Sequence, residues 1–114
     1  HKIDKDEAWI NWSNTATSID RQVRAFEPAV TWLGDMRVRL WETGVAADPE
    51  QVEAAPGTII DATKQGIRVT TGSGELVVRA LQLPVGKGRI IGAVDALNAR
   101  ADLLAKGAVF RNQS

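Results

Sequence analysis

Lysine and arginine are the residues of this sequence whose number and spacing suggest a function, because the usual catalytic groups are scarce. The chain has no cysteine and one histidine, His1, which resembles the remnant of an expression tag more than a ligand. The paired carboxylates Asp4 with Asp6 and Glu50 with Glu53 lie in polar segments that offer no apolar surroundings. The sequence therefore favours a binding domain over a catalyst, and no metal site is expected in it.

Two glycine-rich segments could in principle hold phosphate. Neither GSG at 72–74 nor GKG at 86–88 has the full spacing of a P-loop or of a dinucleotide-binding turn. The first is typical of a hairpin turn. The second places Lys87 and Arg89 next to glycines, so we expect exposed side chains and a backbone that a ligand can approach closely.

The charges are unevenly distributed along a chain whose net charge is zero. Residues 42–61 hold five acidic residues and no base, whereas residues 62–114 hold eight bases against three acids. The first part of the chain adds further arginines, namely Arg21, Arg24, Arg37 and Arg39. Because a partner responds to the local field and not to the net charge, a basic surface is expected.

The segment 36–41 alternates apolar and basic residues with the period of a β-strand. If Val38 and Leu40 face a core, then Arg37, Arg39 and Trp41 face outward. Four tryptophans, at 9, 12, 32 and 41, are available to such a surface. They favour core and rim packing, while an aromatic platform beside arginines and a contact with another domain remain open alternatives.

The elements that must position these residues fit one small domain of 114 residues. Residues 1–16 resemble an arm or the tail of a linker. Apolar residues at helical spacing predict a helix through 18–26, with Ser13, Thr17 or Ser18 as its N-cap, Asp20 in its first turn and Pro28 ending it.

Beyond Pro28 the period changes to two, and Gly34-Asp35 predicts a two-residue hairpin. Strands are expected near 30–33, 36–43, 58–63, 67–71 and 75–83, followed by a glycine-rich basic loop at 84–92. A last helix is expected from Asp95, with Leu97, Ala101 and Leu104 on one stripe and Gly107 as its C-terminal stop. Together these predict a mainly β fold with flanking helices, a small open β-barrel whose ends the helices cap.

Several segments, taken in order, resemble the C-terminal domain of the methionyl-tRNA formyltransferase family. The segments are AWINWS (8–13), RAFEP (24–28), APGTIIDATKQGIRVTTGSGELVVRALQL (55–83) and GKGRIIGAVDALNAR (86–100). The chain departs from the family where Ala29-Val30 replaces a frequent Trp-Pro, and where Gly92 replaces the serine before the last helix.

The resemblance implies an open barrel related to the OB-fold that occupies residues 1–114 and is not itself catalytic. It implies a separate N-terminal catalytic domain, absent from this sequence, which would bind 10-formyltetrahydrofolate, so no cofactor is expected here. The partners it implies are initiator tRNA and that catalytic domain, with no membrane and no metal, in the cytoplasm, for which the lack of cysteine is suitable.

The resemblance also assigns residues to a tRNA-binding surface. Lys87 and Arg89 stand where the family has a lysine pair, and Arg24 and Arg100 match arginines in their motifs. Arg37, Arg39 and Lys64 are added because we expect them to be exposed. Contacts from such side chains to phosphates would orient the RNA without reading its sequence.

Two alternatives remain. The chain could be the C-terminal domain of another formyltransferase, of the sugar-nucleotide or formyl-folate type, which the neutral net charge would suit. It could also be a structural module that docks on a catalytic partner, which would have no affinity for RNA at any salt concentration.

Overall fold

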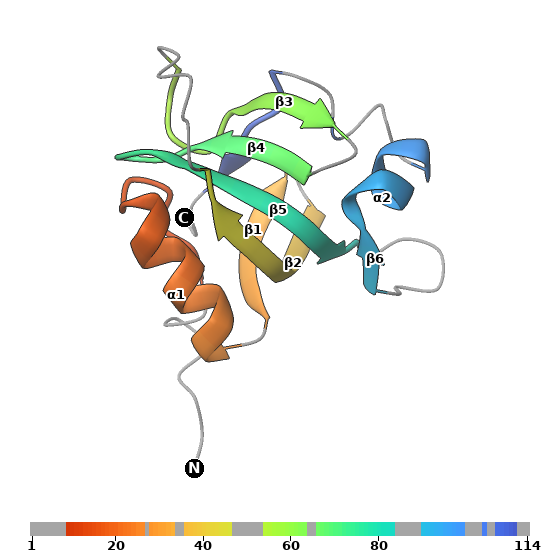
Figure 1. The fold of residues 1–114 in the computed structure, drawn as a ribbon, viewed down its shortest axis with the longest axis horizontal. Helices are drawn as coiled ribbons and strands as arrows, with labels where there is room; N and C mark the ends of the chain where they lie inside the picture. Colours follow the sequence, from red (N-terminus) through yellow and green to blue (C-terminus); the bar gives the residue numbers. More distant parts are fainter. Residues whose placement is uncertain are drawn as a thin grey trace.

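A computed structural model describes most of the chain, namely residues 9–26, 28–33, 36–46, 54–63, 66–83, 90–99, 104 and 107–111. Strands predominate in it (Figure 1). The helices are α1 (Ala16–Phe26) and α2 (Ala93–Ala99). The strands are β1 (Ala29–Leu33), β2 (Met36–Val45), β3 (Ile59–Thr63), β4 (Gly66–Thr70), β5 (Glu75–Gln82), β6 (Ile90–Gly92) and β7 (Phe110–Arg111).

The strands form one antiparallel sheet in the order β3-β4-β5-β2-β1-β7, with β6 paired to β5. In the first hairpin Leu33 pairs with Met36, as the sequence predicts, while the predicted turn residues Gly34 and Asp35 lie outside the described residues. The strand pairs β3–β4 and β4–β5 follow as successive antiparallel neighbours. The expected strands at 58–63, 67–71 and 75–83 are confirmed to within a residue or two at each end.

Residues 107–111 join the two outer edges of this sheet. Phe110 and Arg111 pair with β1, while Val109 bridges Thr58 just before β3. The amide of Ile59 donates to the carbonyl of Ala108 at 2.8 Å, and the amide of Phe110 donates to the carbonyl of Gly57 at 2.7 Å. The sheet therefore curls into the small barrel that the sequence predicts, and its outer strands gain hydrogen-bond partners.

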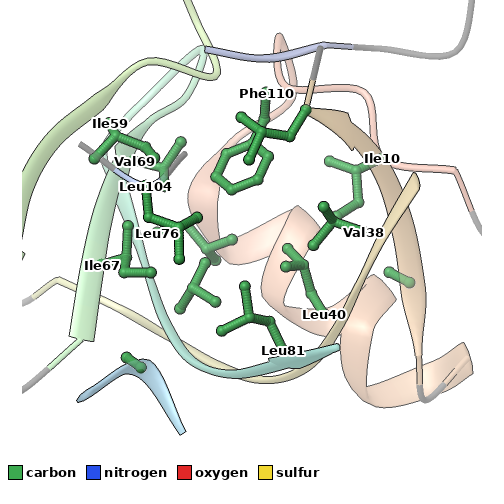
Figure 2. Packing of buried hydrophobic residues seen from close by; sticks show 14 of the residues in the cluster. Ile10, Val38, Leu40, Ile59, Ile67, Val69, Leu76, Leu81, Leu104 and Phe110 are labelled. Carbon is green, nitrogen blue, oxygen red and sulfur yellow. The ribbon is translucent and has the colours of Figure 1, made fainter. Parts of the chain in front are cut away.

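The barrel interior is the hydrophobic core (Figure 2). Its fully buried side chains come from every strand from β1 to β5 and from β7, and they include Ala29, Val38, Leu40, Ile59, Ile67, Val69, Leu76, Leu81 and Phe110. The helices lie at opposite ends of the barrel in Figure 1. Ile19 and Val23 of α1 and Ala93 and Ala96 of α2 complete the core, as expected for helices that cap a barrel.

Residues 9–15, part of the expected N-terminal arm, lie against the barrel. Ile10 and Trp12 are each 1% exposed, and the amide of Ile10 donates to the carbonyl of Val30 at 2.9 Å. The indole N–H of Trp12 donates to Thr31 Oγ1 at 2.8 Å, and its ring stacks on Phe110 with centroids 5.5 Å apart. This part of the arm belongs to the core, because it buries two large apolar side chains.

Helix α1 begins differently from the expectation. The N-cap is Thr15, whose Oγ1 accepts from the amide of Ser18 at 3.1 Å, and not Ser13, Thr17 or Ser18. Because the helix starts at Ala16, Asp20 lies beyond the first turn, where it is buried instead of facing the free amides. The helix ends at Phe26, ahead of Pro28 as predicted.

The C-terminal part of the barrel also differs from the expectation. The expected loop at 84–92 ends in a strand, because Ile90, Ile91 and Gly92 pair with β5 as β6. Helix α2 starts directly after Gly92, at Ala93, and Leu104 lies in a bend, so the predicted helix is too long. Gly107 has a φ of 97°, but its amide donates to the carbonyl of Ile59 and not to a helix, so its role as a helix stop is wrong.

Candidate nucleic-acid interface

Strands β1 and β2 present one set of side chains to the core and another to the outside. The residues of β1 alternate between buried and half-buried along its five positions. In β2 Val38 and Leu40 are fully buried, whereas Arg37 is exposed and Arg39 half-buried. The predicted outward orientation of both arginines follows directly from this two-residue alternation.

The register of the strands fixes which outward residues are neighbours. Arg37 lies opposite Trp32 and Arg39 opposite Val30. On the far side of β1, Arg111 lies opposite Trp32, and Trp9 bridges Val30. We call these six residues the outer wall: Trp9, Val30, Trp32, Arg37, Arg39 and Arg111.

Three of the four tryptophans divide between the core and this wall. Trp12 is a core residue, which agrees with the packing that the sequence favours for it. Trp9 and Trp32 stack with their centroids 5.3 Å apart and an angle of 21° between their rings, and both remain half-buried. Trp41 is half-buried too, and its indole N–H donates to Gln82 Oε1 at 3.0 Å.

Irregular pairing between β2 and β5 changes which residues face outward above the wall. Leu40 pairs with Leu81 but Glu42 pairs with Ala80, so Trp41 is an extra residue in β2. Arg79 is the matching extra residue in β5, because Thr43 pairs with Val78.

The exposed side chain of Arg79 lies across β2. A Cβ placed on Gly44 would be 3.1 Å from Arg79 Cζ, which shows how closely the guanidinium approaches the strand. Arg79 and Arg111 are exposed cations that the sequence-based site did not include. The only signal for them was their contribution to the basic excess after residue 62.

The two described ion pairs involve no residue of the outer wall. Arg24 Nε is 3.1 Å from Asp20 Oδ2, with the Arg24 side chain 69% exposed. Arg68 is 2.9 Å from the buried carboxylate of Glu75. Among the described residues, no carboxylate within 4 Å pairs with Arg37 or Arg39. The structure thus brings Arg37 and Arg39 together on one face and places Arg24 on α1, beside Asp20.

Lys64, Lys87, Arg89 and Arg100 lie outside the described residues, but the ends of their segments are placed. The segment that holds Lys87 and Arg89 connects Leu83 to Ile90. Ile90 pairs with Gln82, and Gln82 pairs with Arg39, so this segment starts and ends close to Arg39. Lys64 belongs to the β3–β4 connection, which β5 separates from β2 in the sheet, and Arg100 follows α2.

The part of the chain that the structure describes contains no group of three or more His, Cys, Asp or Glu side chains placed to hold a metal ion. In that same part, neither helix has the length and apolar character needed to cross a membrane.

Some known proteins resemble this chain in sequence, and others resemble it in fold. The family model for the formyl transferase C-terminal domain matches residues 2–100. Methionyl-tRNA formyltransferase from Coxiella burnetii strain CbuK_Q154 is 44% identical over 109 residues, which cover 93% of this chain and 33% of that protein. The same enzyme from strain RSA 493 is 43% identical over the same length. The chain therefore spans about a third of the length of these curated relatives.

Solved structures add agreement in fold. HypX from Aquifex aeolicus in complex with tetrahydrofolic acid superposes with a TM-score of 0.71 over 99% of this chain and 21% of that one, at 12% identity. A multiply substituted variant of the same HypX gives a TM-score of 0.70 over 92% of this chain and 19% of that one, at 13% identity. The family match over most of the chain, and the identity to the Coxiella enzymes, show that this chain belongs to the formyl transferase C-terminal domain family and is homologous to methionyl-tRNA formyltransferase.

Proposed function

We propose that this chain is the tRNA-binding domain of a methionyl-tRNA formyltransferase. In the proposal, the enzyme transfers a formyl group from 10-formyltetrahydrofolate to the methionyl group of initiator tRNA at the start of protein synthesis in the cytoplasm. The chemistry belongs to an N-terminal catalytic domain. The present chain, as the C-terminal domain, holds the body of the tRNA, so that the charged acceptor end lies in the active site of the catalytic domain.

The outer wall is the observation that carries the proposal. Arg37 and Arg39 extend from the same face of β2, and no described carboxylate pairs with either of them. Arg111 lies on that face two strands away, across β1. Guanidinium groups arranged in this way can neutralise phosphates of an RNA backbone, which raises affinity and fixes orientation.

The segment with Lys87 and Arg89 extends this surface in the proposal, because both of its ends lie close to Arg39. Arg24, Lys64 and Arg100 belong to it as outlying contacts. Such a surface would recognise the shape of an RNA helix and its phosphates, and would leave the choice of the acceptor end to the catalytic domain.

The test is a titration of initiator tRNA at several salt concentrations, first with this chain and then with the full-length enzyme that carries it. For the wild type, the logarithm of the affinity should fall linearly with the logarithm of the salt concentration. The double variant Arg37→Ala/Arg39→Ala should reduce that slope by about two, and Lys87→Ala/Arg89→Ala should do the same.

The matched control is Arg21→Ala, which removes an exposed arginine that is not one of the six residues of the outer wall. Its slope should equal that of the wild type. A slope that both double variants leave unchanged would remove those residues from the interface. Absence of tRNA binding at every salt concentration would reject the proposal and favour a domain that only docks on its catalytic partner.

A further inference from the structure

The outer wall contains an aromatic surface as well as cations. Trp9 and Trp32 stack on each other from neighbouring segments of the sheet, with their ring centroids 5.3 Å apart. Both residues are half-buried, so each keeps part of its surface open to solvent. Core packing explains the position of Trp12, and the hydrogen bond to Gln82 explains that of Trp41. The stacked pair, by contrast, lies on the outside of the barrel.

Arginines lie on both sides of this pair. Trp32 has Arg37 opposite it in β2 and Arg111 opposite it in β7. Side chains directly opposite each other on antiparallel strands have Cβ atoms about 4.5–5.5 Å apart, so both guanidiniums can reach a ligand seated on the indole. None of the six residues of the outer wall is acidic.

The arginines suit phosphates of paired and unpaired RNA alike, whereas the stacked indoles favour an unpaired nucleotide. A nucleobase outside a helix has a free π-face that can stack on an indole, while its phosphates accept hydrogen bonds from arginine. A base within a duplex already stacks on its neighbours and offers only the backbone. A second protein would need carboxylates to match these arginines.

We propose that the outer wall binds one unpaired nucleotide of the RNA, with its base stacked on the Trp9–Trp32 pair and its flanking phosphates held by Arg37 and Arg111. The inference rests on the proposed function and adds to it, because it assigns the domain a contact with a base in addition to contacts with phosphates.

The test compares two probes of equal length and charge: a single-stranded RNA hexamer, and the same hexamer with abasic residues in place of its nucleotides. Fluorescence anisotropy of each labelled probe gives its affinity for this chain. The hexamer with bases should bind more tightly, by on the order of 5- to 150-fold. Trp32→Leu should remove that preference and leave the affinity for the abasic probe unchanged.

Trp41→Phe is the control, since it alters a tryptophan of the neighbouring strand β2 that lies outside the stacked pair. It should keep the full preference for the hexamer with bases. If Trp32→Leu does not fold, the indole N–H resonances of the wild type decide: those of Trp9 and Trp32 should shift on addition of the hexamer, and those of Trp12 and Trp41 should not.

Equal affinity of the wild type for both probes, or shifts confined to Trp12 and Trp41, would overturn the inference. Either result would leave the proposed function standing if the binding of RNA remained salt-dependent. The outer wall would then be a surface for phosphates or for the catalytic part of the enzyme. No binding of either probe and none of tRNA would count against both.

Discussion

At the scale of single residues, Asp20 shows how this domain uses a buried carboxylate. Asp20 lies on the face of α1 that packs on the barrel, and its Oδ1 accepts from Thr43 Oγ1 at 2.7 Å. Its other oxygen meets Arg24 one helical turn later. The carboxylate of Asp20 therefore links α1 to β2 through a buried hydrogen bond. In the sequence Asp20 resembles a residue that compensates the helix dipole, but in the structure it makes a tertiary contact.

We expect Asp20→Ala to lower the free energy of unfolding by about 1–3 kcal/mol, because the Thr43 hydroxyl loses its acceptor in a buried place. Asp20→Asn should cost less, since its amide oxygen can still accept that hydrogen bond. Arg24→Ala should cost about 0–1 kcal/mol, as its side chain is 69% exposed. Urea denaturation measures all three. An Asn variant as unstable as the Ala variant would show that the charge matters more than the hydrogen bond to Thr43.

At the scale of elements, the segment 107–111 can close the barrel because the backbone at Gly57 lies very close to the backbone of β7. A Cβ on Gly57 would lie 2.2 Å from the carbonyl oxygen of Phe110, whose amide donates to the Gly57 carbonyl. Gly57 has a φ of 95°, almost the same as the 97° of Gly107. A Cβ on Gly107, by contrast, would meet nothing within 4 Å.

Alanine substitutions at Gly57 and Gly107 distinguish the cost of backbone strain from the cost of a steric clash. Gly107→Ala should destabilise the domain by about 1–2 kcal/mol, the cost of a left-handed backbone for alanine. Gly57→Ala carries the same strain and must also push β7 away from Gly57, so it should cost at least about 2 kcal/mol more. Thermal and urea unfolding of the two variants measure the difference. Equal stabilities would mean that β7 moves aside freely and does not help to close the barrel.

At the scale of the whole molecule, stability depends on a core that the last described strand completes. Phe110 is 1% exposed, stacks on Trp12 and faces the side chains of the other strands inside the barrel (Figure 2). It joins the N-terminal segment to the end of the chain. The arginines of the outer wall therefore keep their positions only while this core is intact.

Phe110→Ala should lower the free energy of unfolding by about 3–5 kcal/mol, because it leaves a cavity in the centre of the core. That is a large part of the roughly 5–15 kcal/mol typical of a domain. Its neighbour Val109 is 41% exposed, and Val109→Ala should change stability by less than about 0.5 kcal/mol. Urea titration monitored by circular dichroism compares them, and similar losses for the two variants would contradict a core role for Phe110.

Local signals in the sequence were enough to predict several of the elements. The alternation along 36–41 predicted which way Arg37 and Arg39 face, Gly34-Asp35 predicted the hairpin, and helical spacing predicted α1. The order of several short motifs indicated the family, which the comparisons confirm. Each of these signals depends on residues close together in the chain, where backbone geometry converts spacing into direction.

The contacts between residues far apart in the chain could not be predicted and are known from the folded barrel alone. Arg111 reaches the outer wall because β7 pairs with β1, and Thr31 binds the carbonyl of a residue 80 positions away. Closing the barrel brings about the short strands β6 and β7, the extra residue at Trp41 and the stacking of Trp9 on Trp32. No period in the sequence reports such contacts, because the register between distant strands is set by the packing of the whole core.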